Sequence, residues 1–360
     1  MTASPPTASL RPAPRGDDRA AAPHPRGRTV AVIGATGAVG QEMLRCLERS
    51  AHPTARLRAF ASARSLGKTV RFRDQDVAIE ALSEEAFAGV DVALFASSSE
   101  VSRRYAPAAI AHGAIVVDNS SAFRMDEAIP LVVPEVNGAA LDARPSLVAN
   151  PNCVAALMVM ALWPLCALSP IRRVIASTYQ AASGAGAAAM EELRLSTQAY
   201  LEGRTYQHSV LPHPYAFNLF SHNTAIDPET GYNGEESKVI AETRKIFAAP
   251  DLPVSATCVR VPVLRAHSVS ITAEFADPIT PDTARRLIAD APGVRLVDDA
   301  ANNYFPMPID ASGQDDILVG RIRQDLSDPS GRSLSLFVAG DQLLKGAALN
   351  AVQIAELLLV

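Results

Sequence analysis

Cys153 is the residue whose surroundings most clearly predict chemistry. It follows Asn150, Pro151 and Asn152 and opens an uncharged apolar stretch, Val154–Leu162. A helix that begins at the cysteine would place the sulfur beside the first-turn backbone amides, where the positive end of the helix dipole favours thiolate over thiol. We therefore expect Cys153 to be a nucleophile, and a nucleotide-binding turn far upstream indicates oxidation or reduction at an acyl carbon.

That turn lies between a predicted strand, Thr29–Ile33, and a predicted amphipathic helix, Gln41–Arg49. Its residues are Gly34, Ala35, Thr36, Gly37, Ala38, Val39 and Gly40. Glycines let backbone NH groups approach a pyrophosphate at the N-terminus of the helix. A glycine triplet at this spacing can also be only a tight turn, but its place between a strand and a helix favours dinucleotide binding.

The residues after the second predicted strand, Leu57–Ala61, indicate which dinucleotide binds. A site for NAD usually has an acidic residue here to hold the ribose 2′-hydroxyl, whereas this chain continues Ser62, Ala63, Arg64, Ser65. The hydroxyls of Ser62 and Ser65 and the guanidinium of Arg64 favour a 2′-phosphate and therefore NADP. Arg64 is equally compatible with a solvated loop.

The other three cysteines, Cys46, Cys166 and Cys258, are expected to be small buried hydrophobic residues. No Cys-x-x-Cys pattern and no signal peptide are visible, so neither a disulfide framework nor a metal site is predicted. Reduced thiols in the cytoplasm are the simplest interpretation.

Length and composition indicate a soluble globular protein with two domains. The chain has 360 residues, 48% of them hydrophobic, and a net charge of −5 with its basic residues scattered. Scattered charge gives no basic face for nucleic acid or an anionic membrane, but it is compatible with a small anionic substrate. The longest apolar run, Val154–Cys166, is about 13 residues long and too short to span a bilayer.

The chain divides into three predicted parts. Residues 1–27, rich in Pro, Ala and Arg, are expected to be a disordered tail, because they cannot bury enough apolar surface to offset chain entropy. Residues 28–152 together with 341–360 are expected to form a dinucleotide-binding domain. Residues 153–340 are expected to form a catalytic and dimerisation domain.

Strands and helices alternate in the first domain, where further strands at 90–96 and 114–118 flank a helix at 103–112. This alternation predicts a parallel, doubly wound sheet. The later part has longer strands at 171–179, 256–263, 269–275 and 333–339 and helices at 186–201, 236–247 and 281–289. It predicts an α+β domain with a mixed or antiparallel sheet. A helix at 343–359 is expected to pack on the first domain or across the junction.

Six polar residues are further candidates for a binding site: Arg124, Gln180, Glu235, Lys238, Arg260 and His267. Arg124 follows a strand at its carboxyl end, where open α/β sheets bind ligands. Glu235 and Lys238 lie one helical turn apart, so both can face one cavity. Each residue has an ordinary structural alternative, such as a surface ion pair for Arg124 or a satisfied loop contact for His267, but their joint occurrence favours a site.

With these pieces together, the chain resembles the aspartate-semialdehyde dehydrogenase family. The matching segments are GATGAVG at 34–40, PLVVPEVN at 130–137, NPNC at 150–153, SGAG at 183–186, EESK at 235–238, RVPVLRAH at 260–267 and NAVQIAE at 350–356. They extend from about residue 29 to the C-terminus and are jointly specific, although the glycine-rich turn alone would not be. The tail at 1–27 departs from the family pattern.

The resemblance implies a role for each candidate. Cys153 is implied as the nucleophile, His267 as the acid/base catalyst and Gln180 as the residue that orients the substrate and the thioacyl intermediate. Arg260 is implied to bind the substrate α-carboxylate, Glu235 its ammonium group, and Arg124 and Lys238 phosphate, with Asn152 shaping that site. Further cofactor contacts are expected at Ser97, Ser183, Gly184 and Gln353, the last near the nicotinamide.

The resemblance also implies the fold and the reaction. The expected fold class is α/β, with a Rossmann-type doubly wound parallel sheet domain plus an α+β catalytic and dimerisation domain, as in glyceraldehyde-3-phosphate dehydrogenase. The expected reaction is the reversible NADPH-dependent conversion of L-4-aspartyl phosphate to L-aspartate 4-semialdehyde and phosphate through a cysteine thioacyl intermediate. It would serve the biosynthesis of lysine through diaminopimelate, and of threonine, methionine and isoleucine.

A cytoplasmic homodimer is expected, which binds NADP and a small-molecule substrate but neither nucleic acid nor a membrane. Two alternatives stay open. One is an enzyme like N-acetyl-glutamyl-phosphate reductase, which shares the acyl phosphate, the thiolate and NADPH but acts on a substrate without a free ammonium group. The other is a family-like paralogue that serves as a non-catalytic scaffold.

Overall fold

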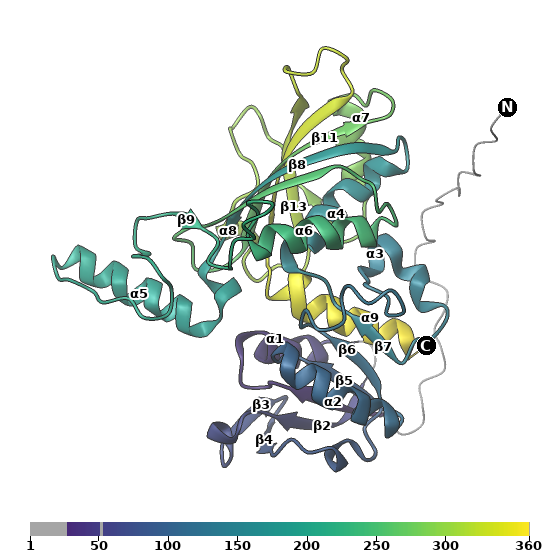
Figure 1. Cartoon of the computed structure of the whole chain (residues 1–360), viewed down its shortest axis with the longest axis vertical. Helices are drawn as coiled ribbons and strands as arrows, with labels where there is room; N and C mark the ends of the chain where they lie inside the picture. The colour runs from purple at the N-terminus through teal and green to yellow at the C-terminus, as the bar shows by residue number, and fades with distance from the viewer. Residues whose placement is uncertain (1–26, 51–52, 360) are drawn as a thin grey trace.

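The computed structural model describes residues 27–50 and 53–359. The disordered tail predicted for residues 1–27 lies outside the described residues, apart from Gly27. Within the described part the strands form two seven-stranded sheets, one in the lower half of Figure 1 and one in the upper half. The helix near the C-terminus lies between them.

The first sheet has the order β3-β4-β2-β1-β5-β6-β7. Its strands are β1 (Arg28–Ile33), β2 (Thr54–Phe60), β3 (Thr69–Phe72), β4 (Gln75–Glu80), β5 (Val92–Phe95), β6 (Ile115–Asp118) and β7 (Leu147–Ala149). Every neighbouring pair is parallel except β3 and β4, which form an antiparallel hairpin at the edge. From β4 to β7 the order is that of a doubly wound nucleotide-binding sheet, so the predicted fold class is confirmed.

Both faces of this sheet are covered, as the alternation of β1 shows. Val30 and Val32 pack with α1 (Ala38–Glu48) and α9 (Leu349–Leu358), whereas Ala31 and Ile33 pack on the other side with α2 (Ser99–Ala111). Because both of their faces are buried, the central strands β5 and β6 are almost entirely apolar. The C-terminal helix therefore packs on the first sheet, which is one of its two expected positions.

The second sheet is mixed, as expected, with the order β12-β13-β14-β11-β8-β10-β9. Its strands are β8 (Ile171–Gln180), β9 (Phe220–Ser221), β10 (Val254–Arg260), β11 (His267–Phe275), β12 (Val294–Leu296), β13 (Ile317–Gln324) and β14 (Ser333–Gly340). The pairs β8–β10 and β12–β13 are parallel and the others antiparallel.

The largest apolar core lies against the second sheet and includes α4 (Cys153–Cys166), α6 (Gly234–Ile246) and α7 (Pro281–Ala289). Ten of the fourteen residues of α4 are buried, because the helix contacts both α6 and the sheet. We therefore propose that the boundary between the two units lies directly before Cys153, with residues 341–360 returning to the first unit.

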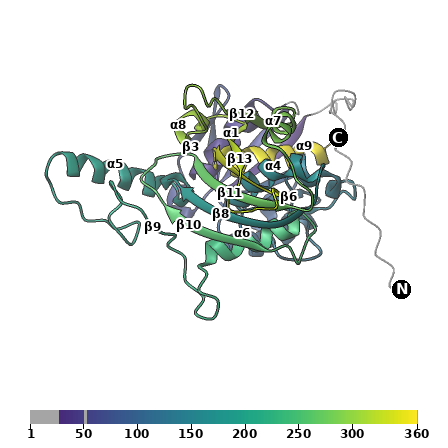
Figure 2. The same cartoon turned by 90° about the horizontal axis from the view of Figure 1, so that it is seen from above.

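The remaining α-helices of the described residues are α3 (Pro134–Asn137), α5 (Ala187–Leu201) and α8 (Pro308–Ala311). Figures 1 and 2 show α5 extending away from both sheets as an arm. The arm has a small apolar cluster of its own, which includes Leu193, Leu211 and Tyr215.

Candidate active site

Cys153 is the first residue of α4, as predicted. Asn152 caps the helix, and its side-chain oxygen accepts hydrogen bonds from the backbone amides of Val154 at 2.9 Å and Ala155 at 3.2 Å. On the other side Gly346 packs against the cysteine, because a Cβ at Gly346 would lie only 2.8 Å from the Cβ of Cys153. The position of the sulfur is therefore set by a cap on one side and a close backbone contact on the other.

The sequence predicts that Cys153 prefers the thiolate form. The protein groups around the sulfur contradict this prediction, because together they raise the pKa of the thiol. Burial raises the pKa of the Cys153 thiol to about 12, and the carboxylate of Glu235 raises it further. Arg124, Arg260 and the backbone amide of Val154 lower the pKa by less. Desolvation of the thiolate thus outweighs the helix dipole.

The remaining cysteines are free thiols. Cys46 and Cys258 are buried, as predicted, whereas Cys166 is only partly buried. Burial raises the pKa of each of them, to about 11 for Cys46 and about 12 for Cys166 and Cys258.

The second sheet brings Gln180, Arg260 and His267 to one edge. Gln180 ends β8 and Arg260 ends the parallel strand β10, where the two residues are register partners. His267 begins β11, which runs antiparallel to β8, so its first residue also lies at this edge. Three residues far apart in the sequence thus come together because of the strand order.

His267 is fully buried, and its two ring nitrogens differ. Nδ1 accepts a hydrogen bond from the backbone amide of Ala181 at 3.0 Å, while Nε2 has no partner among the described residues. Burial, helped by the charge of Arg260, lowers the pKa of His267 to about 3. The imidazole is therefore neutral at physiological pH with its proton on Nε2, a donor that faces Gly184.

Arg260 is 4% exposed, and no carboxylate in the described part of the chain lies within ion-pair distance of it. Its hydrogen-bond partners are Oδ1 of Asn223 at 3.3 Å and the carbonyl of Ala181 at 3.4 Å. A buried guanidinium without a counter-ion is costly. This side chain therefore offers a charge that an anionic ligand can satisfy.

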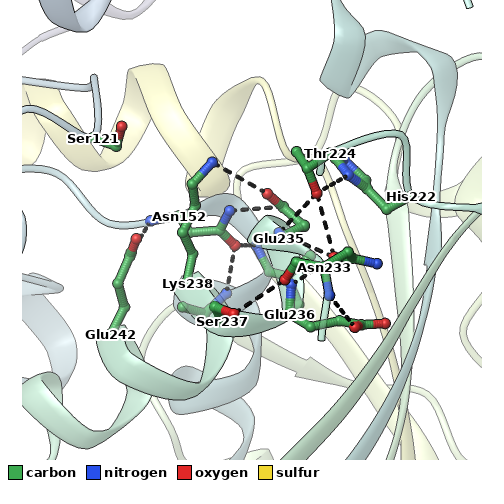
Figure 3. A network of polar contacts seen from close by, with 12 residues as sticks. Ser121, Asn152, His222, Thr224, Asn233, Glu235, Glu236, Ser237, Lys238 and Glu242 are labelled. Carbon is green, nitrogen blue, oxygen red and sulfur yellow. Dashed lines mark hydrogen bonds and ion pairs between the residues drawn. The ribbon is translucent and has the colours of Figure 1, made fainter. Parts of the chain in front are cut away.

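Glu235 is the centre of a buried polar network that Figure 3 displays. Its Oε1 accepts hydrogen bonds from Nδ2 of Asn152 at 2.8 Å and Nε2 of Gln180 at 3.0 Å, and Nζ of Lys238 lies 3.8 Å from Oε2. Burial alone would raise the pKa of Glu235, but attraction to His222 and Lys238 and the two amide donors outweigh burial and lower it. Glu235 is thus a carboxylate beside the cysteine, joined to three of the predicted site residues, Asn152, Gln180 and Lys238.

Arg124 is buried, so the alternative of a surface ion pair is wrong. Its Nη1 lies 3.0 Å from Oε1 of Glu242, and its Nη2 donates to the carbonyl of Asn119 at 2.7 Å. The Nε of Arg124 is buried and has no partner among the described residues. The other oxygen of Glu242 accepts the backbone amide of Asn152, so this carboxylate ties Arg124 to the residue before Cys153.

The glycine-rich turn has a shape that fits a pyrophosphate. Gly34 has φ +91°, and a Cβ there would lie 2.2 Å from the carbonyl of Ala96. Gly40 approaches the carbonyl of Gly34 equally closely, so both glycines are needed to close the turn. Thr36 and Gly37 are exposed, and the first turn of α1 has no side-chain cap, which leaves its NH groups for an anion.

The other expected cofactor residues lie in different surroundings. Ser62, Arg64 and Ser65 lie on or beside a short 3₁₀ turn after β2, and Arg64 is exposed. Ser97 follows β5, beside the glycine turn, and its buried Oγ has no partner among the described residues. Ser183 accepts a hydrogen bond from Gln342, and Oε1 of Gln353 accepts one from Nζ of Lys345 at 2.6 Å.

Comparison with known proteins identifies the family. Residues 29–144 match the family model "Semialdehyde dehydrogenase, NAD binding domain", and residues 162–345 match "Semialdehyde dehydrogenase, dimerisation domain". The chain is 54% identical to the aspartate-semialdehyde dehydrogenase of Synechocystis over 329 residues. This alignment covers 91% of this chain and 96% of the relative. The chain is 46% identical to the aspartate-semialdehyde dehydrogenase of Bacillus subtilis, over 92% of this chain and 97% of the relative.

This chain belongs to the aspartate-semialdehyde dehydrogenase family. The predicted resemblance is confirmed, and the chain is accordingly an oxidoreductase with a nicotinamide-dinucleotide-binding domain. Solved structures agree: aspartate semialdehyde dehydrogenase II from Vibrio cholerae is 40% identical and superimposes with a TM-score of 0.88, over 92% of this chain and 98% of that one. A second structure of that protein is described as complexed with ASA.

The sequence did not single out two polar residues of the candidate site, Glu242 and His222. Glu242 lies four residues after Lys238 on α6, and this helical spacing is a signal that could have placed it on the same face. His222 follows the two-residue strand β9, and nothing in its sequence neighbourhood indicates a site. Burial and nearby Arg260 lower the pKa of His222 to about 4, and its Nδ1 lies 3.3 Å from Oγ1 of Thr224.

Two further properties hold for residues 27–50 and 53–359. None of their helices combines the length and apolar character needed to cross a membrane. Nor do their His, Cys, Asp and Glu side chains gather into a group of three or more that could hold a metal ion.

Proposed function

We propose that this enzyme interconverts L-4-aspartyl phosphate and L-aspartate 4-semialdehyde plus phosphate, with NADP as its cofactor. The observation that carries the proposal is Arg260, a buried guanidinium without a carboxylate partner in the described residues, set beside Gln180 and His267 at one sheet edge. Such a group can clamp a carboxylate through two hydrogen bonds. Relatives named aspartate-semialdehyde dehydrogenase, and a relative's structure described as complexed with ASA, support the choice of substrate.

The proposed substrate has two charged ends, and the site has a group for each charge. Arg260 would bind the α-carboxylate, and the Glu235 carboxylate would receive the ammonium group. Lys238 is partly exposed and Arg124 has an unpaired Nε, so both retain donors for the phosphate. Asn152 joins these groups, because its side chain contacts Glu235 and its backbone amide contacts Glu242.

In the proposed reaction the sulfur of Cys153 attacks the acyl carbon, the carbon–oxygen bond to phosphate breaks, and a thioester forms. A thioester carbonyl accepts a hydride more readily than an ester, and the bound dinucleotide would supply that hydride. The oxyanion that develops on the acyl carbon would be stabilised by the Nε2–H of His267. The thiol proton of Cys153 would pass to the departing phosphate in the first step. Collapse of the oxyanion to the aldehyde then expels the thiolate, which takes up one proton from solvent.

In this proposal His267 donates a hydrogen bond but does not act as the base expected from the family resemblance. Because Nδ1 already accepts the amide of Ala181, the ring has no free lone pair to take the thiol proton. We infer that His267 acts as a hydrogen-bond donor. The ammonium group of the substrate, by pairing with Glu235, would remove part of the negative charge that raises the pKa of Cys153.

We propose NADP rather than NAD because of the residues after β2. No acidic residue follows that strand to hold a ribose 2′-hydroxyl, and Arg64 is an exposed guanidinium for which no ion pair exists among the described residues. Ser62 and Ser65 add hydroxyls on the same turn. Gly34, Gly37 and Gly40 with the amides of Ala38 and Val39 would hold the pyrophosphate, with Thr36, Ser97, Ser183, Gly184 and Gln353 as further proposed contacts.

We also propose a homodimer. The family model over residues 162–345 is described as a dimerisation domain, and the central strand β8 leaves one face open. Val174 and Ala176 on β8 are buried, whereas Ile175 and Tyr179 on the opposite face are 40% and 38% exposed. A central strand with exposed apolar side chains is typical of an interface.

The proposed physiological role is biosynthesis of the amino acids derived from aspartate. An enzyme like N-acetyl-glutamyl-phosphate reductase is disfavoured, because its substrate has no ammonium group for the buried carboxylate of Glu235. A non-catalytic scaffold would not need the joint arrangement of Cys153, His267 and Arg260.

The proposal is tested by following NADP reduction with aspartate semialdehyde, with and without phosphate. Wild type should turn over only with phosphate, and Cys153→Ser should lose at least about 10³-fold of the rate. Cys166→Ser, on the same helix but at its far end, is the matched control and should keep its rate. A silent wild type, or a Cys153→Ser variant that is folded and fully active, would refute the proposal.

A further inference from the structure

One ion pair connects the cofactor helix to the loop that carries His267. Arg265 lies two residues before His267, and its Nη1 lies 2.7 Å from Oε1 of Glu42. Glu42 belongs to α1, the helix that begins at the glycine-rich turn, and is 5% exposed. The pair is thus largely buried between the two units of the molecule.

The same guanidinium also binds the start of a second segment, residues 341–348, which packs against Cys153. Its Nε lies 2.6 Å from Oδ2 of Asp341, which is fully buried and also accepts the backbone amide of Leu343 through Oδ1 at 3.0 Å. This segment continues into the π-helix Leu344–Ala348, whose Gly346 touches Cys153. Arg265 therefore contacts the cofactor helix and the support of the nucleophile at once.

The residue between Arg265 and His267 has an unfavourable backbone. Ala266 has φ +69°, a left-handed conformation that residues with a Cβ rarely adopt, and it is fully buried. Its amide donates to Oε1 of Gln342 at 3.0 Å, and Gln342 in turn donates to Ser183. Strained backbone of this kind persists only where its neighbours hold it, and here the neighbours are Arg265, Gln342 and Asp341.

We propose that Arg265, through Glu42, is a positioning residue that couples the place of the cofactor helix to the orientation of His267. When a pyrophosphate binds at the N-terminus of α1, Glu42 on that helix holds Arg265 in place. Arg265 is joined to His267 through the left-handed residue Ala266, so the backbone of His267 is held in place as well. The inference rests on the proposed function, because it takes the glycine-rich turn as the NADP site and His267 as a catalytic group.

The chain offers a matched control for this pair. Arg49, the residue directly after α1, forms a two-pronged ion pair with Asp315 across the same boundary, at 2.5 and 2.6 Å, but both side chains are about half exposed and neither touches the His267 loop. Loss of this pair removes a contact between the units without disturbing Arg265.

The test compares Glu42→Gln, Arg265→Met, the double variant and Arg49→Met with wild type. We expect kcat for NADP-dependent oxidation of aspartate semialdehyde to fall by about tenfold or more in each of the first two variants, and no further in the double variant, because the two residues act as one unit. Arg49→Met should stay within about twofold of wild type.

Hydrogen exchange of the peptide that contains the Ala181 amide, which binds Nδ1 of His267, supplies a readout apart from turnover. NADP should slow this exchange in wild type and Arg49→Met but not in Glu42→Gln or Arg265→Met. If Arg265→Met does not fold, Glu42→Gln decides alone. Two results with an active wild type would overturn the inference. In one, Glu42→Gln behaves like Arg49→Met in both measurements. In the other, the losses of kcat in Glu42→Gln and Arg265→Met add up in the double variant. A wild type that neither binds NADP nor turns over would instead refute the proposed function.

Discussion

Nδ1 of His267 accepts the backbone amide of Ala181 at 3.0 Å, and this one contact determines what the ring can do. A nitrogen that accepts an amide proton cannot also carry one, so the neutral ring has its proton on Nε2. Ala181, the first residue after β8, thereby selects the tautomer of His267, the first residue of β11. The two strands are antiparallel neighbours in the sheet.

The tautomer predicts how substitutions of His267 rank. Glutamine can place an amide donor near the position of Nε2, so His267→Gln should lose about tenfold in kcat, whereas His267→Ala should lose about 10² to 10³-fold. Wild-type kcat should also show no inflection from imidazole between about pH 5 and 8, because burial lowers the pKa of His267 to about 3. Steady-state kinetics across pH tests both expectations, and equal losses in the two variants would argue against a donor role.

Reactivity of Cys153 should depend on pH and on Glu235. Because burial raises the pKa of its thiol to about 12, alkylation by iodoacetamide should accelerate continuously from about pH 7 to pH 10 without a plateau. Glu235→Gln removes a negative charge that raises this pKa, so alkylation at a fixed pH should be several-fold faster, at about tenfold for each pKa unit.

Peptide-resolved mass spectrometry measures this rate and includes an internal control. Cys166, whose pKa is raised by its own burial and not by Glu235, should react at an unchanged rate in the variant. A plateau for Cys153 below about pH 8 would mean that the thiolate is already favoured before substrate binds.

Arg260 predicts a trade between stability and function. Arg260→Met removes a buried charge without a counter-ion, so the free energy of unfolding should rise by about 1–3 kcal/mol while the Michaelis constant for aspartate semialdehyde rises at least about 100-fold. Arg260→Lys keeps the charge but not the two-pronged geometry and should fall between wild type and Arg260→Met in binding. Denaturant melts and kinetics check the two effects, and a less stable Arg260→Met with normal kinetics would contradict the carboxylate assignment.

Arg64 predicts the choice of dinucleotide. Arg64→Ala should raise the Michaelis constant for NADP by about tenfold or more and leave that for NAD nearly unchanged, because only NADP has a 2′-phosphate. Arg71→Ala, which removes an exposed arginine from the nearby strand β3, serves as the control. Equal effects of Arg64→Ala on both dinucleotides would move the phosphate site elsewhere.

Local patterns in the sequence were sufficient for four strands of the first sheet, β1, β2, β5 and β6. Runs such as Thr29–Ile33 are β-branched and apolar, so strand and turn could be read directly, and the glycines of the turn have the close contacts that their spacing predicts. The start of α4 at Cys153 also follows from its cap, Asn152. The strands β3, β4 and β7, at or next to the edges of this sheet, were not predicted, because they are short and lack a clear pattern.

The rest of the site depends on contacts between distant segments. Gln180 and Arg260 become neighbours only because β8 and β10 pair in parallel, and no local pattern encodes that pairing. The same holds for the thiol of Cys153: a helix start favours the thiolate, but the burial that reverses this effect comes from segments far away in the sequence. Glu242 was within reach of sequence reasoning, since it shares a helix face with Glu235 and Lys238.

The central claim is that the sulfur of Cys153 carries the acyl group. The most direct measurement mixes wild type with aspartate semialdehyde and NADP in the absence of phosphate, follows NADPH formation and maps the adduct by peptide mass spectrometry. We predict a burst of about one NADPH per chain, an aspartyl group on Cys153, and its release when phosphate is added. An absent burst, or an acyl group on another residue, would contradict the account.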